Sequence, residues 1–267
     1  MRWLDRLARS SEPDTLSDAD VATRMAMAYE AATRSDFTSA LAIWGPLAQA
    51  GVARAQSNVG ASFAEGLGVE RDPALALHWL TPAAEAGDPV GQRNLAAAYL
   101  KGDGVAQDHA RAAELFRAAA EQGDGPAQNF LSRMLLDGDG VSVNVVEALR
   151  WALAAAEHGI ASAMTRIGML YHEALGVERD PHEAAHWWRR AAMRGDADGQ
   201  AMLGVACARG AGVPRDPGAA LAWLLRAQAG GSARAAAHVG EARAALDAGG
   251  VAEAERRAAA PLAELAP

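Results

Sequence analysis

The chain of 267 residues is poor in cysteine, lysine and aromatic side chains, and these shortages exclude several classes of protein. Cys207 is the single cysteine, so an internal disulfide framework and a zinc site built from several cysteines are excluded. Lys101 is the one lysine, and 25 basic residues stand against 33 acidic ones, which gives a formal charge of −8. Because no Lys/Arg-rich stretch is present to neutralise phosphates, we expect no nucleic-acid partner.

Long apolar runs are also missing. No uncharged apolar run approaches the length of about 18 residues that a membrane-spanning helix needs, so we expect no membrane span. Residues 1–16 interrupt their apolar side chains with arginines and an aspartate, and therefore lack the apolar core of a signal peptide. The expected location is the cytoplasm. Trp3, Leu4 and Leu7 leave membrane-surface docking open as an alternative to an N-terminus that is disordered or packs on itself.

Alanine is abundant where other residues are scarce, with 68 copies in the chain. It is the best helix former and a poor strand former, so the composition excludes an all-β protein and favours an all-α one.

Several kinds of residue recur every 36 positions, which indicates an internal repeat. One glycine column runs through Gly51, Gly87, Gly123, Gly159, Gly195 and Gly231, and a second column consists of Asp36, Asp72, Asp108, Asn144, Asp180 and Asp216. A Gly-x-Gly-Val element lies between these columns at 66–69, 102–105, 138–141 and 210–213, and the copy at 174–177 has lost its first glycine.

Each unit is predicted to be a hairpin of two helices. The segment 53–65 carries apolar side chains at helical spacing, and Gly66 follows it where a helix C-terminus favours a residue that tolerates positive φ. Asp72 followed by Pro73 is typical of a helix start, because the carboxylate accepts free backbone N–H groups and proline has none to lose.

These residues resemble the Sel1-like repeat, a relative of the tetratricopeptide repeat. The resemblance rests on the Gly-x-Gly-Val element, the aspartate that follows it, the Ala-x-x-Trp segment and the closing glycine. It implies an all-α solenoid of stacked helix hairpins. The predicted organisation is an N-terminal amphipathic stretch and linker (1–16), a tetratricopeptide-like cap repeat (17–51), five Sel1-like repeats (52–231) and a capping half-repeat with a tail (232–267).

Three features are predicted to be structural. The column Trp79, Leu115, Trp151, Trp187 and Trp223 is expected to fill the core between repeats, and Cys207 takes the place that Phe63 and Tyr99 hold in other copies. Small residues in phase at Ala55, Gly91, Ala127, Ala163 and Gly199 are expected to let the helices cross closely.

Residues 182–186 read His-Glu-Ala-Ala-His, the pattern of a zinc peptidase with two histidines at i and i+4. The repeat places this string in the first turns of an ordinary second helix, and no glutamate follows between 187 and 239 to act as a third ligand. We therefore expect no metal, no other cofactor and no catalytic residue.

The resemblance implies a protein-interaction scaffold or adaptor. If the units stack as tetratricopeptide repeats do, the first helix of each repeat lines a concave groove, and its middle part carries the most varied side chains. The resulting candidates for binding a protein or peptide partner are Arg93, Leu100, Asn129, Arg133, Leu136, Thr165, Met169 and His172. Folding alone is not expected to require side chains such as Arg93, Arg133 and His172.

Two alternatives remain open. One is a solvated groove whose residues bind nothing. The other is a metal-dependent or covalent hydrolase, either peptidase-like or β-lactamase-like. The paired cysteines of the family members linked to β-lactam chemistry are absent, which weakens that interpretation.

Overall fold

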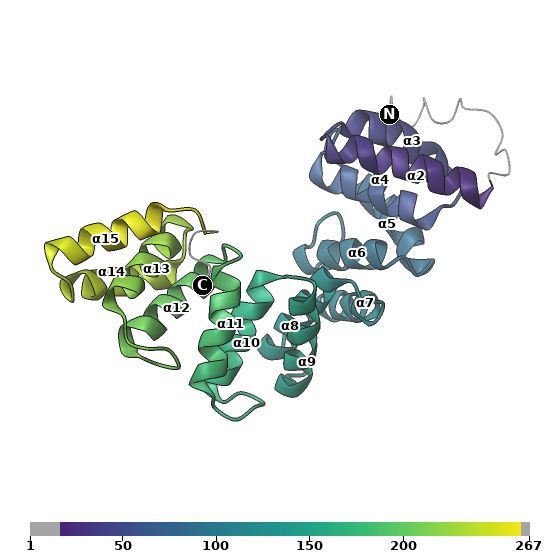
Figure 1. Ribbon diagram of the computed structural model, residues 1–267. Helices are drawn as coiled ribbons and strands as arrows, with labels where there is room; N and C mark the ends of the chain where they lie inside the picture. Colours follow the sequence, from purple (N-terminus) through teal and green to yellow (C-terminus); the bar gives the residue numbers. More distant parts are fainter. Residues whose placement is uncertain (1–16, 263–267) are drawn as a thin grey trace. The chain divides into compact units, whose positions relative to one another are not determined.

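The computed structural model describes residues 17–262, and its regular structure in that range consists of fourteen α-helices without a strand. Consecutive helices form hairpins that repeat every 36 residues through most of the chain (Figure 1). The predicted all-α class and hairpin repeat are confirmed. The predictions for residues 1–16, including docking by Trp3, Leu4 and Leu7, lie outside the described residues.

In each hairpin we call the earlier helix the first helix and the later one the second helix. The first helices are α2 (Asp18–Thr33), α4 (Ala53–Glu65), α6 (Pro89–Lys101), α8 (Gly125–Asp137), α10 (Ala161–Glu173), α12 (Ala197–Arg209) and α14 (Ala233–Ala244). The second helices are α3 (Phe37–Gln49), α5 (Pro73–Glu85), α7 (His109–Glu121), α9 (Val145–Glu157), α11 (Pro181–Ala192), α13 (Pro217–Ala229) and α15 (Ala248–Ala259). None of these helices combines the length and the apolar character needed to cross a bilayer.

The chain divides into two compact units. Within the described range, unit 1 contains residues 17–127 and 139–142, and unit 2 contains 128–138 and 143–262. The third Sel1-like hairpin, α8 and α9, therefore contributes to both units.

The second helices begin as the sequence predicts. Asp72 accepts hydrogen bonds from the backbone N–H groups of Ala74 and Leu75 at 3.0 Å, and Pro73 occupies the first helical position. Asp180 and Asp216 cap α11 and α13 in the same way.

The Gly-x-Gly-Val loops favour glycine for two reasons. Gly66 ends α4 with φ of 74°, a left-handed conformation that costs other residues energy. Gly68 also has positive φ, and a Cβ atom there would lie 2.8 Å from the backbone carbonyl carbon of Phe37 in the preceding hairpin. The second glycine therefore allows the loop to pack on the start of the previous second helix.

The core between hairpins contains the predicted small residues. Ala55, Ala127 and Ala163 are completely buried, and Gly91 and Gly199 are buried as well. A Cβ atom at Gly199 would lie 2.6 Å from the Cβ of Ala191, so this column allows neighbouring helices to approach closely.

The predicted tryptophan column is confirmed in part. Trp79, Leu115 and Trp151 are buried, but Trp187 and Trp223 are only half-buried. Trp187 packs beneath the guanidinium of Arg190, whose Cζ lies 4.2 Å from the ring centre. The next residue, Trp188, is 2% exposed and fills the core of that hairpin instead.

The C-terminal region differs from the predicted half-repeat, because α14 is followed by a second helix, α15. Asp247 caps α15 by accepting from the backbone N–H of Gly250 at 2.7 Å. The loop before α15 is shorter than in the Sel1-like copies, so this aspartate falls out of the 36-residue register and the repeat pattern does not mark it.

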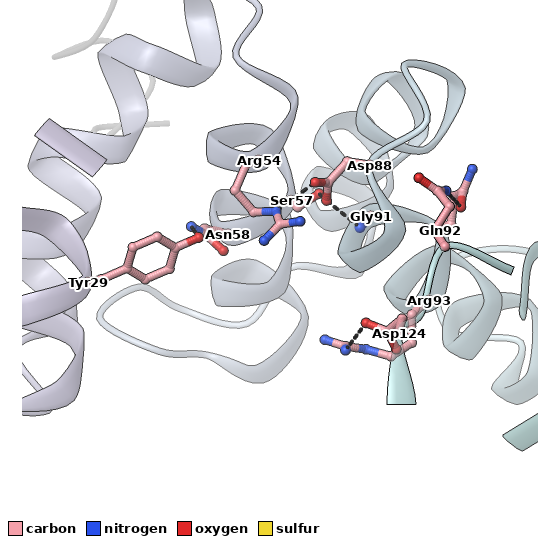
Figure 2. Close-up of polar contacts among 10 residues, drawn as sticks. Tyr29, Arg54, Ser57, Asn58, Asp88, Gly91, Gln92, Arg93 and Asp124 are labelled. Atoms are coloured by element: carbon pink, nitrogen blue, oxygen red, sulfur yellow. Dashed lines mark hydrogen bonds and ion pairs between the residues drawn. The ribbon is translucent and has the colours of Figure 1, made fainter. Parts of the chain in front are cut away.

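Aspartates at three junctions between hairpins join successive first helices, as Figure 2 shows for two of them. Asp88, which is 9% exposed, begins α6 and accepts a hydrogen bond from the backbone N–H of Gly91 at 2.9 Å. It also accepts from Ser57 Oγ and from Arg54 Nε, both at 2.6 Å, and these donors lie on α4, the first helix of the preceding hairpin. One carboxylate thus caps a helix and ties it to its neighbour.

The same arrangement recurs at the two further junctions. Asp124 accepts from Arg93 Nη1 at 2.7 Å and from the backbone N–H of Ala127 at 2.8 Å. Asp196 accepts from Thr165 Oγ1 at 2.6 Å and from the backbone N–H of Gly199 at 2.7 Å. We call Asp88, Asp124 and Asp196 the junction aspartates.

The first testable prediction concerns close packing at Gly168 in α10. A Cβ atom there would lie 2.4 Å from Nε1 of the rigid, buried Trp188. We expect Gly168→Ala to lower the free energy of unfolding by about 1–3 kcal/mol, because the crowding outweighs the better helix propensity of alanine. Urea denaturation measures the change.

Gly240 in α14 is the matched control, because no atom lies within 4 Å of the place that a Cβ atom would take there. Gly240→Ala is expected to raise the free energy of unfolding by about 0.5–1 kcal/mol through helix propensity alone. If both substitutions change the free energy of unfolding equally, close packing at Gly168 does not oppose a larger side chain and the prediction is wrong.

The second prediction concerns the junction aspartates. Asp88→Ala is expected to cost about 3 kcal/mol, because it removes a helix cap and leaves donors of a buried cluster without an acceptor. Asp72→Ala removes only a cap within its own helix and is expected to cost about 1 kcal/mol. Similar losses in urea denaturation would contradict a special role for the junction.

Candidate partner-binding surface

The eight candidate residues lie on three first helices and in both units. Arg93 and Leu100 lie on α6 in unit 1. The six candidates of unit 2 lie on α8 and α10, and they are Asn129, Arg133, Leu136, Thr165, Met169 and His172. The structure therefore groups the candidates of α8 and α10 within one unit and leaves those of α6 in the other.

Two candidates have structural partners. The expectation that folding does not require Arg93 is therefore wrong, and Thr165 serves the fold in the same way. Arg93 is paired with the junction aspartate Asp124, and its side chain is 24% exposed. Thr165 is buried and donates to Asp196. Both positions face the start of the next first helix, where a carboxylate accepts their hydrogen bond, and sequence spacing alone does not reveal this pairing.

Asn129 and Arg133 have a different environment. Asn129 Oδ1 accepts a hydrogen bond from Nη1 of Arg166 on α10 at 2.8 Å. Arg133 is exposed, and its Cζ lies 5.2 Å from the centre of the Phe130 ring. No ion pair or hydrogen bond of the Arg133 side chain occurs among residues 17–262.

Arg166 is not among the residues that the sequence predicts for the site. Burial lowers its pKa to about 10, and repulsion by Arg133 acts in the same direction, while Asp137 and Asp196 oppose the shift. The charge of Arg133 thus disfavours the ionised form of Arg166. A sequence signal does exist, because Ile160 at the start of the same helix interrupts the column of junction aspartates.

The apolar candidates Leu136 and Met169 are half-buried. Leu136 packs against the core cluster that contains Ile167 and Leu170. It therefore contributes to folding as well as to the surface. Leu100 in unit 1 is half-buried too.

His172 lies at the edge of a cavity of about 280 Å³ in unit 2. Its ring centre is 5.5 Å from that of Trp188, and its Nε2 is 3.8 Å from the Glu173 carboxylate. The cavity lies among α10, α11, α12 and α14, and its lining comprises His172, Trp188, Ala201, Met202, Val205, Ala206, Arg209, Ala211, Arg234, Ala237 and His238. Of the eight predicted candidates, only His172 lines this cavity.

The lining of the cavity is mainly apolar, and its basic groups have few acidic partners. Arg209 is exposed and makes no hydrogen bond or ion pair with any described residue. Arg234 Nε lies 4.0 Å from Asp198 Oδ2, at the limit of an ion pair. The hollow therefore offers apolar contact bordered by positive charge.

The His-Glu-Ala-Ala-His string lies at the start of α11, as predicted. His182 Nδ1 lies 3.0 Å from the carbonyl oxygen of Gly212 in the following loop, so this histidine takes part in packing between repeats. His186 is exposed and meets the Trp187 ring edge-on at a centroid distance of 6.0 Å. Within residues 17–262, no three His, Cys, Asp or Glu side chains are grouped to hold a metal ion.

Cys207 is buried, in agreement with the prediction. Burial raises the pKa of its thiol, and this effect outweighs the opposing influence of Arg189. The thiol therefore stays protonated near neutral pH, where a nucleophile would need to be a thiolate.

Comparisons with known proteins agree with this architecture. The Sel1 repeat model matches residues 53–88, 89–124, 125–160, 161–196 and 197–232. A comparison with curated protein sequences gave no significant match.

Solved structures show the same fold. A Sel1 repeat protein from Oxalobacter formigenes is 31% identical with a TM-score of 0.69, and the match covers 78% of this chain and 86% of that chain. A protective antigen present in uropathogenic Escherichia coli strains, displaying an SLR fold, is 29% identical with a TM-score of 0.75. That match covers 97% of this chain but 56% of the antigen, so the chain spans little more than half of that relative.

The five consecutive matches cover two thirds of the chain, and each begins at a first helix and ends at the residue before the next one. The protein therefore belongs to the Sel1 repeat family, and it is an α-solenoid repeat protein.

Proposed function

We propose that this protein is a non-catalytic scaffold that binds an extended segment of a partner protein along the first helices of unit 2. Sel1 repeat proteins are generally protein-interaction scaffolds, which supports the class of function. The observation that carries the proposal for this chain is the apolar cavity with a basic border among α10, α11, α12 and α14.

The cavity, with a volume of about 280 Å³, can receive one side chain of a bound segment. Met202, Val205 and the edge of Trp188 provide apolar contact for one side chain of a bound segment. Methionine adapts its shape readily to different partners, which suits an interaction surface.

Charge at the border favours an acidic segment. Arg209 and Arg234 lie on this border, although the chain as a whole carries a formal charge of −8. Local positive charge on an acidic protein steers negatively charged partners toward that place and repels others. The proposed partner segment therefore combines an apolar side chain with acidic neighbours.

The hydrolase alternative is not proposed, because no arrangement among the described residues favours it. The motif at 182–186 participates in helix and loop packing, and Cys207 is buried with a raised thiol pKa. The cytoplasm is the proposed location of the protein.

The third prediction tests the cavity directly. Ala237 is an exposed residue of α14 that lines the cavity, so a tryptophan there is expected to fill the cavity without disturbing the core. The Ala237→Trp variant should no longer capture the proteins that the wild type captures from native lysate, because the tryptophan occupies the space where the partner side chain binds. Quantitative mass spectrometry of captured proteins gives the measurement.

Ala236→Trp is the matched control, because Ala236 is exposed on the same helix but does not line the cavity. It introduces the same apolar ring and is expected to leave capture unchanged. If Ala237→Trp captures the same proteins as wild type, the cavity is not the binding site. Thermal denaturation of both variants verifies that each is folded.

A further inference from the structure

The junction between α8 and α10 in unit 2 lacks the carboxylate that three other junctions use. Asp88, Asp124 and Asp196 each begin a first helix and accept a hydrogen bond from the preceding first helix. At the equivalent position stands Ile160, and α10 begins without a side-chain cap. The donor position that faces it holds Asn129, which corresponds to Ser57, Arg93 and Thr165 in the repeats with a junction aspartate.

One cationic side chain, Arg166, reaches the donor position of this junction. Arg166 donates through Nη1 to Asn129 Oδ1 at 2.8 Å, and the same nitrogen lies 3.4 Å from the Asn129 carbonyl oxygen. Both acceptors are neutral. In the other Sel1 repeats the position of Arg166 is occupied by Asn58, Asn94, Phe130 and Met202, so this arginine is specific to the repeat that begins at Ile160 instead of an aspartate.

Arg133 adds a second positive charge to the same place. It is exposed, stacks on Phe130 and makes no ion pair with a described residue. Arg133 lies one helical turn after Asn129 on α8, and its positive charge contributes to the lowered pKa of Arg166. A pKa of about 10 still leaves Arg166 charged near neutral pH.

The acidic groups nearby compensate this charge incompletely. Asp137 and Asp196 attract Arg166, but among residues 17–262 its guanidinium donates only to Asn129 and makes no ion pair with either carboxylate. Asp196 already accepts from Thr165 and from the backbone N–H of Gly199. The described residues thus leave two arginines without a carboxylate of their own.

We propose that Asn129 and Arg133 of α8, together with Arg166 of α10, form a binding site for a side-chain carboxylate of the partner segment. The partner would supply the negative charge that this chain provides itself at Asp88, Asp124 and Asp196. Arginine suits this role because its planar group binds carboxylates through two parallel hydrogen bonds. The proposal rests on the proposed function and names one group that the partner must present.

The test uses the full chain and two synthetic peptides. The first is acetyl-Gly-Leu-Glu-Leu-Gly-amide, and the second replaces its glutamate by glutamine. The Nε–Hε nuclear magnetic resonance signals of Arg133 and Arg166 are followed during titration. We expect the glutamate peptide to shift both signals to saturation and to bind about tenfold more tightly than the glutamine peptide, because charged hydrogen bonds are the stronger ones.

Arg133→Gln is the fourth prediction, since it keeps the stem over Phe130 but removes the charge. It should weaken binding of the glutamate peptide by about tenfold or more. Arg150→Gln is the control, because Arg150 lies in the same unit, is exposed and also stacks on an aromatic ring, with its Cζ 4.3 Å from the Trp151 ring centre. This control should bind the glutamate peptide as wild type does.

Ile160→Asp places the missing carboxylate within this chain. It is expected to weaken binding of the glutamate peptide, because an internal carboxylate competes for the same positive charge. Unchanged binding by this variant would contradict the role assigned to the missing aspartate. Circular dichroism verifies that each variant retains its helices.

Three further results would overturn the proposal. They are equal affinity for the two peptides, unchanged affinity after Arg133→Gln, and binding of sodium acetate as tight as that of the glutamate peptide, which would indicate an adventitious ion only. The test is separate from that of the cavity. If the glutamate peptide binds at Arg133 but Ala237→Trp captures the same proteins as wild type, only the cavity proposal is contradicted. If Ala237→Trp loses the captured proteins but the glutamate peptide does not bind at Arg133, only the carboxylate-site proposal is contradicted.

Discussion

The structure depends on close contact between one helix hairpin and the next. A hairpin of two amphipathic helices cannot bury its apolar face alone, so each repeat is stabilised by its neighbours. Two devices make that contact possible in this chain. Small residues such as Gly91 and Gly199 let helices approach, and Asp88 and Asp196 join the helices by hydrogen bonds at the same place. The close approach of the helices and the hydrogen bonds between them occur at the same place because both involve residues at the start of a first helix.

This constraint explains which groove positions are available for binding. Arg93 and Thr165 are polar residues on first helices, yet their polar groups serve the junctions. A polar residue at such a position becomes available only where the neighbouring helix does not offer a carboxylate. Ile160 creates that situation between α8 and α10, and Asn129 there turns toward Arg166. In a repeat protein, departures from the repeat thus distinguish one part of the surface from another.

The same reasoning applies to motifs that resemble catalytic sites. His182 occurs in a string that suggests a zinc peptidase, but its ring nitrogen meets the carbonyl oxygen of Gly212 in the next loop. Cys207 occupies a core position that other repeats fill with Phe63 or Tyr99, and burial raises its pKa. Each residue has a structural role that follows from its place in the repeat.

The sequence by itself determined the architecture, because the 36-residue period, the Asp-Pro helix starts and the glycine loops are local signals that repeat in phase. It did not reveal α15, whose short connecting loop moves Asp247 out of register. It also identified positions that line the groove, but it did not show that Arg93 is paired with a carboxylate while Arg133 is not. Only the tertiary structure decided that difference, because it depends on whether a carboxylate from the next repeat lies within hydrogen-bonding distance. The cavity beside His172 likewise arises from four helices whose side chains are far apart in the sequence.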